Sequence, residues 1–493
     1  MAKSLSTRMA IAFSIAVRYL MLLAQFGSTM VLARLLTPHE IGVYSAGYTV
    51  VALAYLFRDF GLNQYLIQEQ NLNEEKVTSA FTLTVIISWS LGLLVYCLGE
   101  PAAIFFDQPG IASLIHLLSI NFILIPFGSI TIALLRKQLK FEITAGISAV
   151  SALLGIVVSI ATALQGASYF CIAYGAIAET ICTVVLSLFF RNRNYKLRLG
   201  LKGSKQILKF GSMVGAGNVI QHFSLSVIDA VIARILGMGA LGFYSRAYGT
   251  FSLFDRLFTG SINPIILPLF SHANQDQNRL QAGYIKAVDY SIIFAWPFFC
   301  FLYLFTSDVV LLLYGPQWET AVPLVKVLCI GGLLLPPALF SDNLFIAIGR
   351  PEITLNIRII SNVVQLLLVA FAVQFGLKAI CFAVVTFYAC RLLLTLFYLR
   401  KTLSMGAHQF GKIVLRTLPC VVFTVVPALL LNESLKDNDN SLFLNMTFMG
   451  LLSLSGWLLG LFIGKHPFCT EISAILCKLN IMRPGKPPKA SEQ

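Results

Sequence analysis

Fourteen apolar segments, each long enough to cross a lipid bilayer, constrain the fold of this chain more than any other feature of its sequence. A transmembrane helix needs roughly 20 predominantly apolar residues. The segments span approximately 9–33, 40–57, 77–99, 111–134, 143–165, 168–190, 210–234, 240–262, 284–305, 320–346, 353–374, 379–399, 412–431 and 442–463. We therefore predict an all-α polytopic membrane protein with fourteen transmembrane helices, six before a long basic loop, six after it and a final pair.

The composition supports a membrane protein and argues against a nucleic-acid partner. Hydrophobic residues make up 57% of the chain and charged residues only 12%, whereas about 25% of the residues of soluble proteins are charged. The net charge of +14 is explained by Lys and Arg retained in cytoplasmic loops. The ten cysteines show no spacing typical of a metal site or a disulfide framework. We expect no metal and no cofactor.

The charges of the predicted loops indicate the orientation of the chain. Basic residues gather in alternate loops: Arg58, Lys76, Arg136, Lys137, Lys140, Arg191, Arg193, Lys196, Arg198, Lys202, Lys205, Lys209, Arg400, Lys401, Lys412 and Arg416. The other loops hold mainly acidic residues: Glu100, Asp107, Asp308, Glu319, Glu433, Asp437 and Asp439. Because cytoplasmic loops carry the excess of Lys and Arg, we predict that both termini are cytoplasmic.

A stretch of eighteen residues occurs twice in the chain. VLARLLTPHEIGVYSAGY at 31–48 aligns without a gap with VIARILGMGALGFYSRAY at 231–248, and we interpret the pair as an internal duplication. Each predicted repeat has an even number of spans, so the two repeats should be parallel and related by an axis along the membrane normal. The expected domains are two six-helix lobes at 1–200 and 201–405, helices 13 and 14 at 406–465, and an amphipathic then disordered cytoplasmic tail at 466–493.

Polar residues form stripes along two spans that the duplication relates. The first span carries Ser14, Arg18, Gln25 and Thr29, the seventh carries Asn218, His222, Ser226 and Asp229, and the eighth adds Tyr244, Tyr248, Ser252 and Asp255. A charge at the centre of a transmembrane helix costs about 2.5–3.5 kcal/mol on insertion scales, and such charges usually face a bundle interior or a water-filled cavity. We therefore expect these spans to line a hydrated site.

The candidate site residues fall into two groups, and each has a structural alternative. The candidate substrate-binding residues are Arg18, Gln25, Arg34, Arg234 and Arg246, and the candidate coupling-ion residues are Asp229 and His222. Asp229 and Arg246 could instead neutralise each other, as could Asp342 and Arg358. Lys326 and Arg391 could extend towards the membrane surface, His222 could be a helix-contact residue, and Arg34 and Arg234 could stabilise helix C-termini as cations.

Motifs for nucleotide hydrolysis and for common hydrolytic chemistry are missing from the sequence. There is no phosphate-binding loop, no HExxH and no GxSxG. A transporter without its own ATPase, and not an enzyme, is the function class that remains favoured.

Two motifs give the chain a resemblance to a known family. ARLLTPHEIGVYS at 33–45 and RDFGLNQYLIQ at 58–68 resemble the N-terminal signature of Wzx-type polysaccharide flippases, in the lipopolysaccharide or colanic-acid exporter branch of the multidrug/oligosaccharidyl-lipid/polysaccharide exporter superfamily. The resemblance implies V-shaped lobes around a central cavity lined by spans one, two, seven and eight. It also implies a cavity cation, for which Arg18 is our candidate, that engages a diphosphate.

The function that the resemblance implies is export of an undecaprenyl-diphosphate-linked oligosaccharide across the bacterial inner membrane by alternating access. The expected partners are this substrate, membrane lipids, and polysaccharide polymerase and co-assembly proteins. Two alternatives stay open: a membrane-embedded polymerase or ligase that uses the same lipid carrier, and a cation-coupled drug antiporter of the same superfamily. The short outside loops disfavour the first, and the loop signatures disfavour the second.

Overall fold

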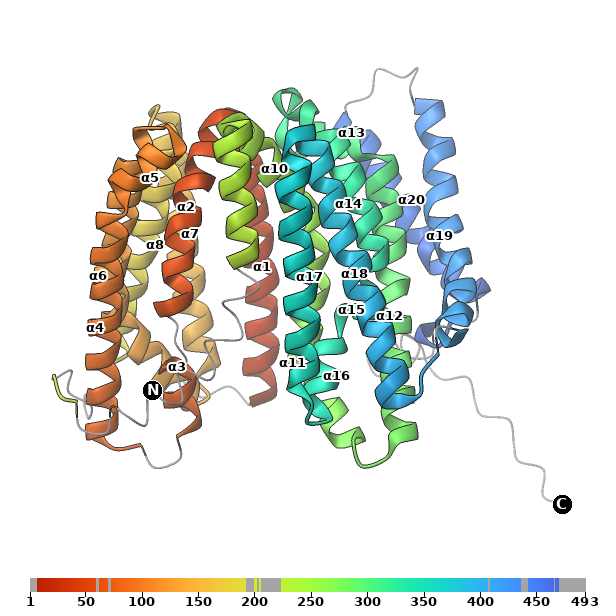
Figure 1. The fold of residues 1–493 in the computed structure, drawn as a ribbon, viewed down its shortest axis with the longest axis horizontal. Helices are drawn as coiled ribbons and strands as arrows, with labels where there is room; N and C mark the ends of the chain where they lie inside the picture. The colour runs from red at the N-terminus through yellow and green to blue at the C-terminus, as the bar shows by residue number, and fades with distance from the viewer. Residues whose placement is uncertain are drawn as a thin grey trace. The chain divides into compact units, whose positions relative to one another are not determined.

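The computed structural model describes residues 7–58, 62–69, 72–191, 199–201, 204, 223–406, 408–435, 442–464 and 466–469 (Figure 1). Nearly all of these residues lie in helices. Among the residues that the structure describes, twelve helical segments are long and apolar enough to cross a membrane: Ala16–Leu35, Pro38–Gln68, Glu74–Cys97, Gly110–Lys137, Phe141–Leu164, Phe170–Phe189, Gln277–Leu304, Pro316–Leu334, Pro351–Phe375, Leu377–Leu403, Gly411–Asn432 and Leu442–Ile463. They match twelve of the fourteen segments expected from hydropathy.

The remaining two predicted segments are the seventh and the eighth. Most of the seventh lies outside the described residues, and only its last part is seen, as a helix over 223–236. The eighth is interrupted: α10 (Met238–Phe251) is followed by a π-helical turn (Asp255–Thr259) and then by α11 (Gly260–Ala273). A count of fourteen spans therefore remains a prediction.

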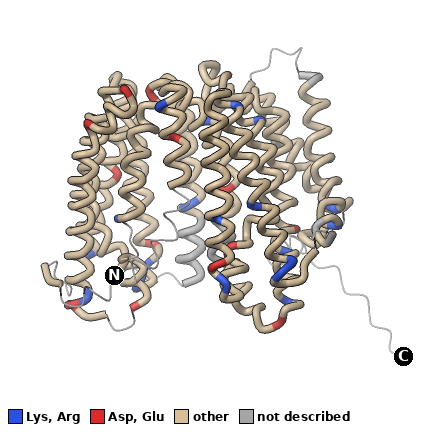
Figure 2. The backbone as a smooth tube through the Cα atoms, viewed as in Figure 1, with Lys and Arg blue, Asp and Glu red and all other residues tan. Residues whose placement is uncertain are grey.

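The chain divides into two compact units. The first comprises Met1–Ala247, Leu313–Ala321 and Asn362–Ala383, and the second comprises Tyr248–Leu312, Val322–Ser361 and Val384–Gln493. Figure 2 shows that Lys, Arg, Asp and Glu occur mainly towards the ends of helices, with fewer along their middle parts, as expected of helices that cross hydrocarbon.

The helices of the first unit pack around α6. They include α1 (Thr7–Leu35), α2 (Pro38–Arg58), α3 (Leu62–Gln68), α4 (Glu74–Cys97), α5 (Gly99–Phe106), α6 (Gly110–Lys137), α7 (Phe141–Leu164) and α8 (Phe170–Phe189), and the unit also contains the helix over 223–236 and most of α10. α6 contacts α2, α3, α4, α5 and α8, and α1 packs on α7. The motif at 58–68 is seen partly as the short helix α3, whose Tyr65 and Leu66 are buried against α4 and α6.

The second unit is built around α12. α12 spans Gln277–Leu304, and the unit also contains α11 (Gly260–Ala273), α14 (Val322–Leu334), α15 (Pro336–Leu339), α16 (Ser341–Ala347), α19 (His408–Leu435) and α20 (Leu442–Ile463). Three helices belong to it only in part: α13 (Thr306–Tyr314), α17 (Pro351–Ala372) and α18 (Leu377–Leu403). The Asp276 side chain caps α12 by accepting from the backbone N–H of Asn278 at 2.9 Å. The predicted tenth span is broken into α14, α15 and α16, at Leu335 before Pro336 and again at Phe340. Proline has no N–H to donate and its ring disfavours the preceding turn, which favours the first break.

Candidate functional site

The two copies of the duplicated stretch pack against each other within the first unit. A Cβ added to Gly42 would lie 1.7 Å from the carbonyl oxygen of Met238, and a Cβ added to Gly242 would lie 1.9 Å from that of Pro38. Glycine is the residue that permits such a close approach of backbones. Since Gly42 aligns with Gly242 and Pro38 with Met238, the contact is reciprocal, as copies related by a local two-fold axis would make it.

A short series of polar contacts continues along α2 from this crossing. The hydroxyls of Ser45 and Ser245 lie 3.3 Å apart, which pairs another two equivalent positions. One turn further, the Thr49 hydroxyl donates to the carbonyl of Ser45 (2.9 Å) and lies 3.5 Å from Oδ2 of Asp229. The structure therefore brings a candidate coupling residue next to the duplicated contact.

Asp229 has no acidic equivalent in the first copy. The aligned residue is Thr29, whose hydroxyl donates to the carbonyl of Gln25 at 2.9 Å. The first copy thus uses this position for a hydrogen bond within its own helix, and the second copy uses it for a carboxylate. The other coupling candidate, His222, lies outside the described residues, as does Asn218 of the same predicted stripe.

Arg34 and Arg234 are aligned arginines of the two copies, and each approaches the end of a short helix from the other half of the chain. The guanidinium carbon of Arg234 lies 5.9 Å from the ring centroid of Phe105 at the end of α5. The Cγ of Arg34 lies 3.8 Å from where a Cβ on Gly315, just after α13, would be. Both arginines are exposed. They occupy equivalent positions beside the duplicated corner.

Arg246 lies over two aromatic rings, 5.8 Å from the centroid of Tyr314 and 5.7 Å from that of Trp318. Trp318 is fully buried, and its indole N–H donates to the carbonyl of Ala33 at 2.8 Å. Gln317 donates to the same carbonyl and to that of Leu36, so the 3-10 turn Pro316–Ala321 caps the end of α1. Arg246 therefore packs against the rings of Tyr314 and Trp318, and the hydrogen bond to Ala33 fixes the position of Trp318.

The structure thus places Asp229 and Arg246 in different surroundings. Asp229 is next to a threonine hydroxyl, and Arg246 is next to two aromatic rings, each of which attracts a cation by about 0.5–2 kcal/mol. Arg18 and Gln25 lie on α1 and are both exposed. Their side chains are two turns apart, on one face of the helix.

The first unit contains a capping box at the start of α2 that sequence analysis did not single out. Thr37 and Glu40 bond reciprocally, since the Thr37 N–H donates to Glu40 Oε2 at 2.7 Å and the Glu40 N–H donates to the Thr37 hydroxyl at 3.3 Å. Ser168, from the loop between α7 and α8, also donates to Glu40. The signal was present in the sequence as Thr-x-x-Glu.

In the second unit, two arginines share one aspartate. Arg358 donates to Oδ2 of Asp342 at 2.8 Å, which confirms the predicted pairing. Arg391 also reaches Asp342, at 3.2 Å, and its side chain is only 17% exposed. The expectation that Arg391 extends towards the membrane surface is therefore wrong, because a carboxylate inside the unit is available to it.

Sequence analysis did not predict a buried contact between Asp289 of α12 and His466, near the end of the described residues. Nε2 of His466 lies 3.0 Å from Oδ1 of Asp289, and both side chains are almost fully buried. Nδ1 of His466 accepts from the backbone N–H of Phe468 at 3.1 Å. The available signal was an acid within the predicted ninth span. Across the part of the chain that the structure describes, no group of three or more His, Cys, Asp or Glu could hold a metal.

Comparison with known proteins gives a family match over most of the chain. Residues 31–323 match a family described as polysaccharide biosynthesis protein. The lipopolysaccharide biosynthesis protein WzxC of Escherichia coli (strain K12) is 25% identical over 67% of each chain. The succinoglycan biosynthesis transport protein ExoT of Rhizobium meliloti is 24% identical over 64% of each chain.

Solved structures with a similar fold cover nearly the whole chain. The lipid II flippase MurJ, in an inward closed conformation, matches 96% of this chain and 100% of its own with a TM-score of 0.73 and 16% identity. An inward-facing multidrug resistance MATE family transporter of the MOP superfamily matches 80% of this chain and 98% of its own with a TM-score of 0.64 and 16% identity. At this identity the likeness shows the fold.

Proposed function

The chain belongs to the polysaccharide biosynthesis protein family, and from this premise we propose that it moves a lipid-linked oligosaccharide across the bacterial cytoplasmic membrane. The observation that carries the proposal is the transporter fold, which matches over 96% of the chain. The carrier that we propose is undecaprenyl diphosphate, and both termini would be cytoplasmic. The named relatives in polysaccharide biosynthesis support this substrate class.

In the proposed mechanism the protein alternates between states that open the substrate site to one side of the membrane and then to the other. The anionic diphosphate would be held by cations, for which Arg18, Arg34, Arg234 and Arg246 are the candidates, because charge-assisted bonds from guanidinium groups suit phosphate oxygens. Gln25 would contact the oligosaccharide. Asp229 and His222 would bind the coupling ion, and its binding and release would drive the change of state.

The duplicated corner supports alternating access on physical grounds. At this crossing Gly42 and Gly242 bring the backbones of the two copies into direct contact, because small residues let helices approach closely. We propose that the helices pivot at this contact when the protein changes state. The polar contacts at Ser45, Ser245 and Thr49 follow on the same helix. Binding of an ion at Asp229 would thus act close to this pivot.

We expect purified protein in proteoliposomes to move a fluorescent undecaprenyl-diphosphate oligosaccharide from one leaflet to the other. Movement would be measured as the fraction of label that becomes accessible to an impermeant quencher, with and without an imposed proton or sodium gradient. Vesicles without protein are the control. Growth of the glycan without movement would support the polymerase or ligase alternative, and movement of cationic drugs in place of the lipid would support the antiporter.

In the same assay, exchange of the charges of Asp229 and Arg246 should not restore transport. We expect Asp229→Arg, Arg246→Asp and the double variant each to insert in the membrane and to retain less than about a tenth of wild-type transport. The reason is that a carboxylate at 246 would face the negative faces of Tyr314 and Trp318, and a guanidinium at 229 would lose the hydrogen bond that Asp229 accepts from the Thr49 hydroxyl. Recovery of wild-type transport by the double variant would instead mean that the two residues are merely an ion pair.

A further inference from the structure

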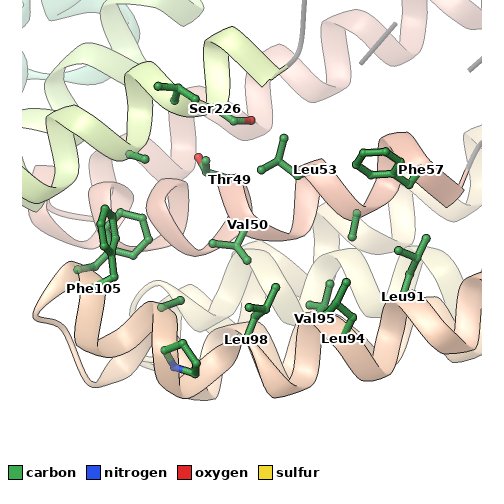
Figure 3. A pocket seen from close by; sticks show the side chains of 16 residues that line it. Thr49, Val50, Leu53, Phe57, Leu91, Leu94, Val95, Leu98, Phe105 and Ser226 are labelled. Carbon is green, nitrogen blue, oxygen red and sulfur yellow. The ribbon is translucent and has the colours of Figure 1, made fainter. Parts of the chain in front are cut away.

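An apolar groove of about 420 Å³ runs along α2 within the first unit. Its walls come from α2, from α4 and α5, and from the helix over 223–236 (Figure 3). Apart from Thr49 and Ser226, every residue that lines it is apolar. Figure 3 shows the side chains of Leu91, Leu94 and Leu98 directed towards α2 across the groove. Its size lies within the about 300–1,000 Å³ that is typical of small-molecule sites.

The groove is open and its large apolar walls are accessible. Phe57 is 44% exposed, Leu94 53% and Phe105 51%. The hydroxyl of Thr49, one of the two polar lining residues, donates to the carbonyl of Ser45 at 2.9 Å and lies 3.5 Å from Oδ2 of Asp229. Apolar cavities offer water no partners and accept apolar ligands. Between membrane-spanning helices, the ligand with this chemistry is a hydrocarbon chain.

A cation lies at one end of the groove. Phe105 is part of the lining, and the guanidinium of Arg234 lies over its ring at 5.9 Å. Arg234 is exposed, so it can also bind a ligand. An apolar channel that ends at an arginine complements an amphiphile with a hydrocarbon chain and an anionic head, and phosphate oxygens bind arginine through strong charge-assisted hydrogen bonds.

One small residue that lines the groove is replaced by a large aromatic residue at the aligned position of the second half. Ala54 lines the groove, and the aligned position of the second copy is Phe254. Phe254 is 4% exposed and packs on Phe258 and Phe299, with ring centroids 5.1 and 5.3 Å away. An aromatic side chain thus fills the position that alanine leaves open. General coverage by phospholipid would require no such difference between the copies.

We propose that this groove holds the polyisoprenyl chain of the lipid-linked substrate while Arg234 binds its diphosphate. The inference rests on the proposed function, and it assigns the tail to the seam between α2, α4 and the helix over 223–236. The polyisoprenyl chain of the substrate would then stay in a hydrocarbon environment throughout transport. The head and glycan would lie beside the duplicated corner while the tail is bound, because Thr49 lines the groove and its hydroxyl lies 3.5 Å from Asp229.

The test uses a polyisoprenyl diphosphate that carries a photoreactive diazirine in its hydrocarbon chain. Full-length protein in nanodiscs is irradiated with this probe, and the labelled peptides are identified by mass spectrometry. We expect labelling of peptides that contain Leu94 or Phe105. Ala54→Phe, which copies the second repeat, and Val50→Phe should each reduce this labelling at least tenfold. Ala161→Phe, the same enlargement at an exposed position of α7, should leave it unchanged.

Competition separates the possible occupants of the groove. Excess unlabelled polyisoprenyl diphosphate should suppress the labelling, whereas excess phosphatidylglycerol should not. Equal suppression by phosphatidylglycerol would make the groove a general lipid site and overturn the proposal, as would unchanged labelling in both groove variants when each is folded. The proposed function has its own readout, because wild-type protein that moves the oligosaccharide without labelling of the groove would refute the tail site alone.

Discussion

Replacement of Gly42 by valine is expected to unfold the duplicated corner and to lower the amount of protein recovered from membranes. The added Cβ would lie 1.7 Å from the Met238 carbonyl oxygen and 2.5 Å from its carbon. Overpacking costs typically about 1–3 kcal/mol, and the upper end applies because the obstacle is backbone and cannot rotate away. The measurement is the temperature at which detergent-solubilised protein loses its monodisperse elution peak.

Gly239→Val is the matched control for this variant. Gly239 lies in the same corner, on α10, and a Cβ there would meet nothing within 4 Å. The reciprocity of the contact gives a second comparison, since Gly242→Val should be about as harmful as Gly42→Val, with its Cβ 1.9 Å from the Pro38 carbonyl. If Gly42→Val were as stable as Gly239→Val, the close crossing of α2 and α10 would be wrong.

Most of the helical spans could be predicted from sequence because hydropathy reports what a bilayer requires of each segment separately. The predicted 77–99 and 442–463 correspond to α4 (Glu74–Cys97) and α20 (Leu442–Ile463). The sequence did not reveal two interruptions of predicted helices, because each is caused by local backbone geometry inside an apolar segment. The π-helical turn Asp255–Thr259 and the break at Pro336 leave hydropathy almost unchanged.

The candidate site was predictable to the extent that it depends on the duplication. Aligned copies suggested that Gly42 and Gly242 are equivalent, but sequence could not show that each glycine packs on the other copy. The placement of Arg246 on Trp318 and the link between Asp289 and His466 join residues far apart in the chain. Such contacts follow from tertiary packing, and neither periodicity nor charge spacing within one helix can reveal them.

Alanine at position 18 is expected to abolish transport and to leave the protein level unchanged. Arg18 is exposed on α1 and lies within the first predicted span. A cation there raises the cost of insertion by about 2.5–3.5 kcal/mol, so its removal should if anything help the chain to enter the membrane. Loss of transport at normal protein level would therefore report a role in substrate binding, since a purely structural arginine would lower both.

The lysine variant and a matched apolar variant complete this test. Arg18→Lys keeps the charge but loses the two-pronged geometry with which guanidinium binds phosphate, so we expect partial transport, at roughly a tenth to a half of the wild-type rate. Leu23→Ala, on the same helix and 67% exposed, should transport normally because it removes exposed apolar surface and no charge. The measurement is initial transport rate per molecule in proteoliposomes of equal protein content. Full activity of Arg18→Ala would remove Arg18 from the site and leave the diphosphate to the arginines beside the duplicated corner.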